Sequence, residues 1–299
     1  MITIEHILCP TDLSPESDEA LRYAMALGRA YKAKLLICYC QEYDLVADPE
    51  AEMHAGVALS DDVAAHVSKL LPGIENWESI ILEGEPAVAI TQEAAKGRAD
   101  LIVMESRRRP RAAALLGSTA EAVCHNAPCP VLVIHQRERE WVDRETREIE
   151  LRRILVAHDF SGHSDLALSY GISFARKFSA ELHLIHVLPP RDETETPGHA
   201  WFGPYEDNVF QLAESRLEKA VPPEDHRECK VYTDVQEGRP FHGVREYAKD
   251  NDIDLICMGV RGEREGLKAM IGSNTDRVLR RAPCPVLIAR PHLRSTASS

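Results

Sequence analysis

Residues 254–273 read DLICMGVRGEREGLKAMIGS, and this stretch decides both the fold class and the candidate site. An apolar strand pattern leads into Gly259, Gly262 and Gly272, at a spacing typical of loops that surround phosphate groups. Residues 100–118, DLIVMESRRRPRAAALLGS, repeat the stretch with other residues at the first two glycine positions. One intact copy and one altered copy predict a duplicated binding fold with two unequal sites.

The rest of the chain is duplicated as well. An Asp-x-Ser motif at Asp12 recurs 147 residues later at Asp159, and the motif APCPVL occurs twice at an offset of 155 residues. We therefore expect two domains, residues 1–137 and 151–292. The charged segment at residues 136–150 lacks a strand pattern, and we interpret it as a solvated linker.

Within each half, short apolar runs typical of strands alternate with helical patterns. Ser14 is expected to cap a helix that starts at Pro15. Alternating units of this kind form parallel sheets with helices on both faces, so the fold class is α/β. The other elements expected in the first half are strands at residues 7–9, 35–39, 79–82, 101–104 and 131–134, and helices at residues 57–70, 86–96 and 119–126.

Composition excludes several function classes. The chain has 35 Lys and Arg against 48 Asp and Glu, a net charge of −13, which repels a nucleic-acid backbone. No apolar run is long enough to span a membrane and the N-terminus lacks an export pattern, so we expect no membrane association and a cytoplasmic location. Cys38 and Cys40 share one face of a strand, and we interpret them as structural rather than reactive thiols.

The chain resembles the universal stress proteins, in a tandem two-domain form. The residues that carry the resemblance are PTDLS from Pro10, HDFS from His158, the loop G-x2-G-x9-G-S from Gly259, and the closing segments NAPCPVLVI and RAPCPVLIA. The resemblance implies two open five-stranded parallel sheets with strand order 3-2-1-4-5, whose final strands pair to form an intramolecular pseudo-dimer. It also implies an adenine nucleotide, usually ATP, bound where the glycine loop is intact.

The candidate site combines both lines of argument. Glycines let backbone amides approach a polyphosphate, and the helix expected after Gly272 presents its N-terminus to it, although the glycines could also serve only as turns. By resemblance, His158 stands where the family has a threonine that touches adenosine, so it either stacks on the base or crowds it. Asp159 is expected either to bind ribose, water or Mg²⁺ or to cap a helix. The predicted site consists of Ala157, His158, Asp159, Val187, Met258, Gly259, Arg261, Gly262, Gly272, Ser273, Asn274 and Thr275.

The corresponding site of the first half is expected to be defective, because Glu105 and Arg108 replace its first two glycines. Arg107, Arg108, Arg109 and Arg111 either clamp a different anion or form a solvated loop, and Arg108 could fill the vacated pocket.

A metal site is disfavoured. His158 and His163 flank Asp159, but His183 and His186 point to opposite faces of one strand and the spacing matches no zinc motif. The expected metal content is therefore none, apart from Mg²⁺ that accompanies ATP.

Three functional hypotheses remain. The leading one is an ATP-binding regulatory protein of the stress response that binds nucleotide only in the second domain. The second is slow ATP hydrolysis or self-phosphorylation, with Asp159, Ser273 or Thr275 as candidate residues and no catalytic residue assigned. The third is an interaction module without nucleotide, or one that binds an apolar or different anionic ligand, with the aromatic residues 201–205 of the insert at 189–207 as its contact. An unidentified protein partner and assembly into homo-oligomers are compatible with each.

Overall fold

The computed structural model describes residues 2–41, 49–70, 76–106, 117–135, 139–190, 207–261 and 271–292, with side chains for all except 49–59 and 207. In the first half the elements are β1 (His6–Thr11), α1 (Pro15–Tyr31), β2 (Lys34–Gln41), α2 (Pro49–Leu70), β3 (Trp77–Glu83), α3 (Pro86–Lys96), β4 (Leu101–Glu105), α4 (Ser118–Asn126) and β5 (Val131–Ile134). In the second half they are β6 (Arg153–Ala157), α5 (Gly162–Phe178), β7 (Glu181–Leu188), α6 (Asp207–Ala220), α7 (Asp225–Glu228), β8 (Val231–Glu237), α8 (Pro240–Asp250), β9 (Leu255–Gly259), α9 (Ser273–Arg281) and β10 (Val286–Ala289).

The expected elements of the first half are all present. Helix α1 begins at Pro15, and the Ser14 side chain accepts a hydrogen bond from the amide of Ser17, as the capping pattern predicts. The expected ranges of α3 and β5 are reproduced without change. The largest difference is α2, which begins at Pro49 rather than at residue 57.

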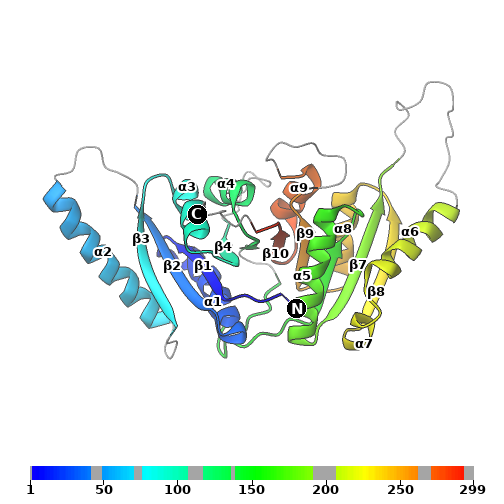
Figure 1. Ribbon diagram of the computed structural model, residues 1–299, viewed down its shortest axis with the longest axis horizontal. Coiled ribbons are helices and arrows are strands. Elements are labelled where there is room, and N and C mark those ends of the chain that lie inside the picture. Colours follow the sequence, from blue (N-terminus) through cyan, green and yellow to red (C-terminus); the bar gives the residue numbers. More distant parts are fainter. Residues whose placement is uncertain are drawn as a thin grey trace, which may run out of the picture.

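The described strands form one ten-stranded sheet with the order β3-β2-β1-β4-β5-β10-β9-β6-β7-β8. Each half has the predicted order 3-2-1-4-5, and the paired strands within each half are parallel. The final strands β5 and β10 pair antiparallel, with Leu132 opposite Leu287. This pairing joins the halves into the expected pseudo-dimer, with β10 at the junction in Figure 1.

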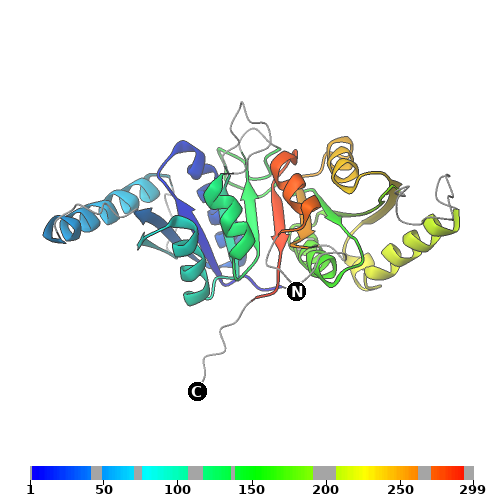
Figure 2. The same ribbon diagram turned by 90° about the horizontal axis from the view of Figure 1, so that it is seen from above.

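Helices cover both faces of this sheet, and each face has its own apolar core. One core extends from Leu27 in α1 to Phe174 in α5, and the other joins Val123 of α4 to Val278 of α9. Figure 2 shows α4 and α9 next to each other at the junction, where Glu121 and Arg280 form an ion pair of 3.0 Å. Both cores therefore cross the boundary between the halves.

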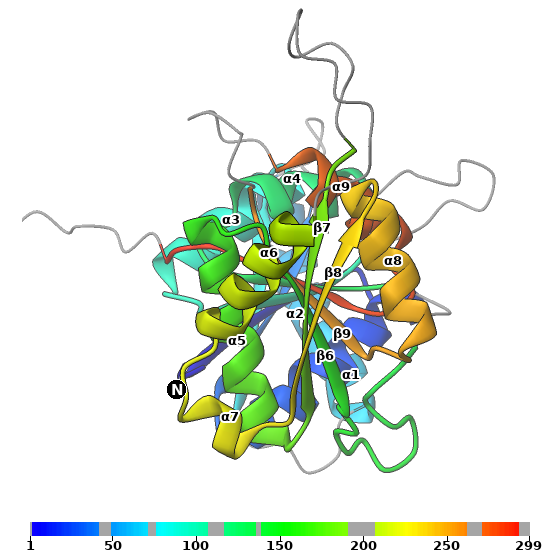
Figure 3. The same cartoon turned by 90° about the vertical axis from the view of Figure 1, so that its right-hand side faces the viewer.

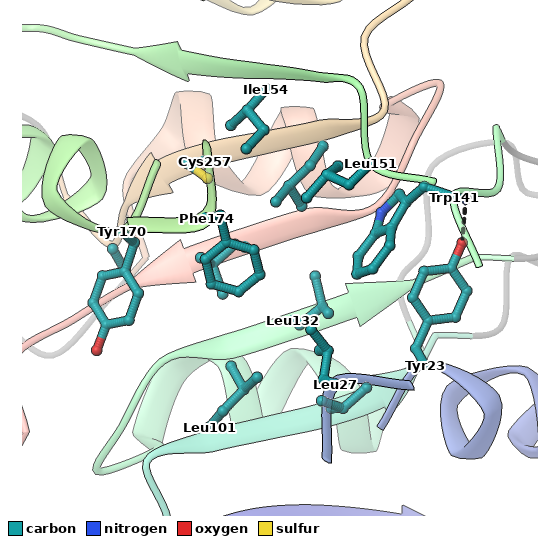
Figure 4. Close-up of a cluster of buried hydrophobic side chains, with 14 of the residues drawn as sticks. Tyr23, Leu27, Leu101, Leu132, Trp141, Leu151, Ile154, Tyr170, Phe174 and Cys257 are labelled. Carbon is teal, nitrogen blue, oxygen red and sulfur yellow. Dashed lines mark hydrogen bonds between the residues drawn. The ribbon is translucent and has the colours of Figure 1, made fainter. Parts of the chain in front are cut away.

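The segment between the halves is not simply solvated, so that interpretation was wrong. Trp141 is 1% exposed, and its ring meets that of Tyr23 edge-on at a centroid distance of 4.6 Å. Its backbone amide donates to the Tyr23 hydroxyl at 3.1 Å (Figure 4). Val142 is also buried and forms an isolated antiparallel bridge with Ile149. Two apolar residues in a charged run enter the shared core, while charged neighbours such as Arg144 stay exposed.

Candidate functional site

A cavity of about 560 Å³ lies beyond the carboxyl ends of β6, β7 and β9. Strand β6 is hydrogen-bonded to β7 on one side and to β9 on the other, so the winding of the chain reverses here. Ligands of open α/β sheets bind at such a reversal. Figure 3 shows the layers around it, with α5 and α6 on one side of β7 and α8 on the other.

The cavity brings together all the predicted site residues except Gly262, which lies outside the described residues. They come from the end of β6, the end of β7, the end of β9 and the start of α9. Sequence reasoning missed twelve further lining residues, and it missed the four from α6 because the insert before this helix gives no spacing that fixes where the helix packs. The additional lining residues are Phe160, Ser164, Ile185, His186, Leu188, Pro189, Val209, Leu212, Ala213, Arg216, Pro240 and Val244.

The turn between β6 and α5 is built around Asp159. Its carboxylate accepts hydrogen bonds from the amide of Ser161 at 3.1 Å and from the Ser161 hydroxyl at 2.6 Å. Ser161 is the N-cap of α5 and accepts from the amide of Ser164 at 3.2 Å. Asp159 thus holds the capping residue in place, and Asp12 holds Ser14 in the same way in the first half.

His158 forms a fixed wall of the cavity and is only 3% exposed. Its Nδ1 accepts a hydrogen bond of 3.2 Å from the backbone amide of Phe160, so the ring proton is on Nε2. Nε2 lies 3.1 Å from a carboxylate oxygen of Asp165 and donates to it. Burial lowers the pKa of His158, and Asp165 only partly opposes that shift. The imidazole is therefore neutral near pH 7 and held at both nitrogens.

An aromatic stack forms the side of the cavity below α6. The guanidinium of Arg216 lies 3.9 Å from the centre of the Phe160 ring, and the His186 ring packs against Phe160 at 4.5 Å. Nδ1 of His186 donates to the carbonyl oxygen of His158 at 2.7 Å. The Phe160 and His186 rings are tilted against each other, and the exposed guanidinium of Arg216 covers the Phe160 ring and adds a positive charge to this wall.

Close packing explains why residue 259 is a glycine. A Cβ atom at Gly259 would lie 2.7 Å from the carbonyl carbon and oxygen of His163, in the first turn of α5. The carbonyl of Gly259 accepts a hydrogen bond of 2.9 Å from the buried hydroxyl of Thr275. Two predicted site residues therefore also tie α5, β9 and α9 together.

The start of α9 is the part of the cavity best suited to an anion. Gly272 is the N-cap and has no side chain to satisfy the first amides of the helix. Ser273 and Asn274 follow and are exposed and half-buried, respectively. Arg261, at the end of the same wall, is half-buried. The positive end of the helix dipole and a guanidinium thus face one space.

The first half differs at the equivalent place. Glu105 occupies the position of Gly259, and the hydroxyl of Ser106 accepts the amide of Gly117 at 3.4 Å. Glu105 is half-buried and places a carboxylate at the position where the second half has Gly259. The four arginines at positions 107–111 lie outside the described residues, so their predicted roles stay predictions.

Metal and thiol chemistry receive no support from the described part of the chain. It contains no group of three or more His, Cys, Asp or Glu residues that could hold a metal ion. His183 turns away from His186 and lies 2.9 Å from the hydroxyl of Tyr247 on the opposite face of the sheet. Burial raises the pKa of Cys40 to about 11 and holds the pKa of Cys38 well above its usual range, so both thiols are protonated at neutral pH.

Comparison with known proteins identifies the family. The model of the universal stress protein family matches twice, at residues 3–135 and 150–290, and the chain belongs to this family. It is 25% identical to a universal stress protein of Mycolicibacterium smegmatis, with 95% of this chain and 97% of the relative covered. It is also 25% identical to the universal stress protein E homolog of Haemophilus influenzae, with 96% and 97% covered.

The fold agrees with a solved relative. The crystal structure of a universal stress protein from Archaeoglobus fulgidus superposes with a TM-score of 0.68 at 23% identity, covering 95% of this chain and 98% of the other. The full-length matches establish a tandem two-domain member of the family. Within the described ranges, no helix has both the length and the apolar content to cross a bilayer.

Proposed function

We propose that the protein binds an adenine nucleotide, ATP, in the cavity of its second half and acts as a regulatory protein of the stress response. The observation that carries the proposal is the convergence of the predicted residues, from four separate segments, on one cavity at the reversal of the sheet. In this arrangement the triphosphate lies at the start of α9, near Ser273 and Arg261, and the adenosine lies against His158 and Val187.

The site residues fit ATP with Mg²⁺ at the level of their chemistry. The first amides of α9, which have no side-chain cap, and the Arg261 guanidinium suit phosphate oxygens. The carboxylate of Asp159, next to His158 in the sequence, can accept a hydrogen bond from a ribose hydroxyl or bind a hydrated cation. The side chains of Asp159 and Thr275 each hold a neighbouring segment of the fold. We therefore propose binding rather than turnover.

Nucleotide binding is proposed for the second domain, residues 151–292, alone. The first domain, residues 1–137, carries Glu105 in place of Gly259, and the carboxylate repels a triphosphate. In this proposal the first domain has a structural or interactive role, the protein acts in the cytoplasm, and its protein partners and oligomeric state remain to be measured.

Titration calorimetry with ATP and Mg²⁺ tests the proposal. We expect a stoichiometry near one nucleotide per chain. Ser273→Asp places a carboxylate at the start of α9 and should abolish binding, whereas Ser118→Asp, the same change at the equivalent position of α4, should leave binding unchanged. Two nucleotides per chain, or none, would contradict the proposal. Mass analysis of any ligand released from the denatured protein then identifies what occupies the cavity.

A further inference from the structure

A second concave site lies beside the first turn of α8 and the C-terminal half of α9. It is a groove of about 290 Å³, lined by Arg239, Phe241, His242, Arg277, Arg280 and Arg281. No residue of this basic groove lines the larger cavity, although Pro240, between Arg239 and Phe241, does. Four guanidinium groups thus gather in one groove of a chain whose net charge is −13.

Most of this positive charge is not neutralised within the described residues. Arg280 is paired with Asp276 at 2.8 Å and with Glu121 at 3.0 Å. For Arg239, Arg277 and Arg281, the described part of the chain supplies no ion pair, and all three are exposed. The basic groove therefore keeps a surplus of positive charge that can attract an anion from solution.

A buried aromatic ring forms the floor of the basic groove. Phe241 is 5% exposed, and the guanidinium of Arg281 lies 5.9 Å from the centre of its ring. Arg245 approaches the same ring at 5.6 Å. Contact with the ring face favours positions in which Arg281 stays over the groove rather than extending into solvent.

The first half provides an internal comparison, because its fold is the same and its residues differ. The positions equivalent to Arg239, His242, Arg277 and Arg281 are occupied by Glu85, Val88, Ala122 and Asn126. Arg280 corresponds to His125, so the first half has no arginine at any of these positions and the arginine cluster is not required to form the fold.

The difference between Arg239 and Glu85 is the most informative one. Glu85 is the N-cap of α3, and its carboxylate accepts hydrogen bonds from the amides of Ala87 at 3.2 Å and Val88 at 2.8 Å. Arg239 is the N-cap of α8 and makes no such bond. In the first half the carboxylate of Glu85 lies at the start of α3. In the second half the N-cap side chain makes no hydrogen bond at the start of α8, and guanidinium groups line the groove beside it.

We propose that the basic groove binds a compact anion with two or more phosphate groups. Several unneutralised guanidiniums match a ligand with several negative charges, and planar guanidiniums bind phosphate oxygens in pairs. The volume lies at the lower end for small-molecule sites, which favours a small ligand. A long nucleic-acid strand would leave the groove and meet the acidic remainder of the surface.

The test uses inorganic triphosphate as the probe and the full chain with Ser273→Asp as the background, so that the larger cavity does not contribute. Calorimetry should detect one triphosphate per chain. Adding Arg277→Gln and Arg281→Gln should weaken binding at least tenfold, since each change removes a charge-assisted hydrogen bond. The matched control replaces the exposed Arg29 of α1 and Arg227 of α7 with Gln, removing the same charge from helices that do not line the groove, and should leave affinity unchanged.

Three results would overturn the proposal. They are no binding in the Ser273→Asp background, equal weakening by the control pair, and equal affinity for orthophosphate and triphosphate. Thermal unfolding of each variant checks that the fold is kept, and Arg239→Gln provides a second variant at the helix cap with the same expected weakening. Because the carboxylate of the Ser273→Asp background opposes anion binding in the larger cavity, failure of the proposed ATP site does not affect the outcome.

Discussion

Replacing Gly259 with alanine is the most direct test of how the site is built. The new methyl group would lie 2.7 Å from the backbone carbon and oxygen of His163, a contact that only a shift of the backbone can relieve. Overpacking of a tight interior typically costs about 1–3 kcal/mol. We expect a loss at the upper end, about 2–3 kcal/mol, because the obstructing atoms are backbone rather than a side chain that can rotate.

The matched control is Gly162→Ala, where the added methyl group meets nothing within 4 Å. Gly162 is the first residue of α5, one position before His163, so both changes add a methyl group near the same turn. Urea unfolding should show a loss of free energy for Gly259→Ala and little change for Gly162→Ala. Equal stability of the two variants would refute the argument that close packing of α5 requires the glycine.

Three further predictions concern other parts of the molecule. Trp141→Ala should lower the free energy of unfolding by about 3–5 kcal/mol in urea, and a loss below about 1 kcal/mol would mean that the segment between the halves is not part of the core. Asp12→Ala and Asp159→Ala should each cost about 1 kcal/mol through their helix caps, but only Asp159→Ala should weaken ATP binding in calorimetry; equal effects on binding would contradict a site confined to the second half. Because burial places the pKa of His158 in the folded protein below its unfolded value of about 6.5, the unfolded state binds more protons below that pH. Stability should therefore fall as the pH drops through 6.5, and less steeply in His158→Thr, which urea unfolding at several pH values can measure.

Much of the fold follows from local patterns in the chain. Pro86 sets the start of α3 and the run Val131–Ile134 forms β5, and both ranges were predicted because proline and β-branched residues restrict the backbone strongly. The start of α2 was not predicted, since residues 49–56 carry a weak apolar pattern. Trp141 was misjudged because two apolar residues among charges have no periodicity, and their burial depends on a core contributed by distant helices.

The candidate site was predictable only in part. Topology predicts that the strand ends and the start of α9 meet, because parallel strands bring their carboxyl ends to one edge, whereas Ala157, His158 and Val187 were implied by the resemblance to the universal stress proteins. The wall from α6, including Arg216, depends on how the helix after the insert packs, and no spacing in the chain encodes it. Gly259 shows a further limit. A glycine indicates that another group packs closely against the backbone at that position. The sequence alone does not tell whether this group is a bound phosphate or, as at Gly259, the backbone of His163.

The two halves share strand order and cores, so their differences at the strand ends and helix starts carry the functional information. At one position in each of the two proposed anion sites, the first half has a glutamate. Glu105 is equivalent to Gly259, and Glu85 is equivalent to Arg239. Glu85 even makes the helix-capping bonds that a bound anion could make in the second half. Because both substitutions leave the fold intact, the negative charge in the first half is not imposed by folding. In the functions proposed above, these two positions favour anion binding in the second half and oppose it in the first, through the placement of charge on a common scaffold.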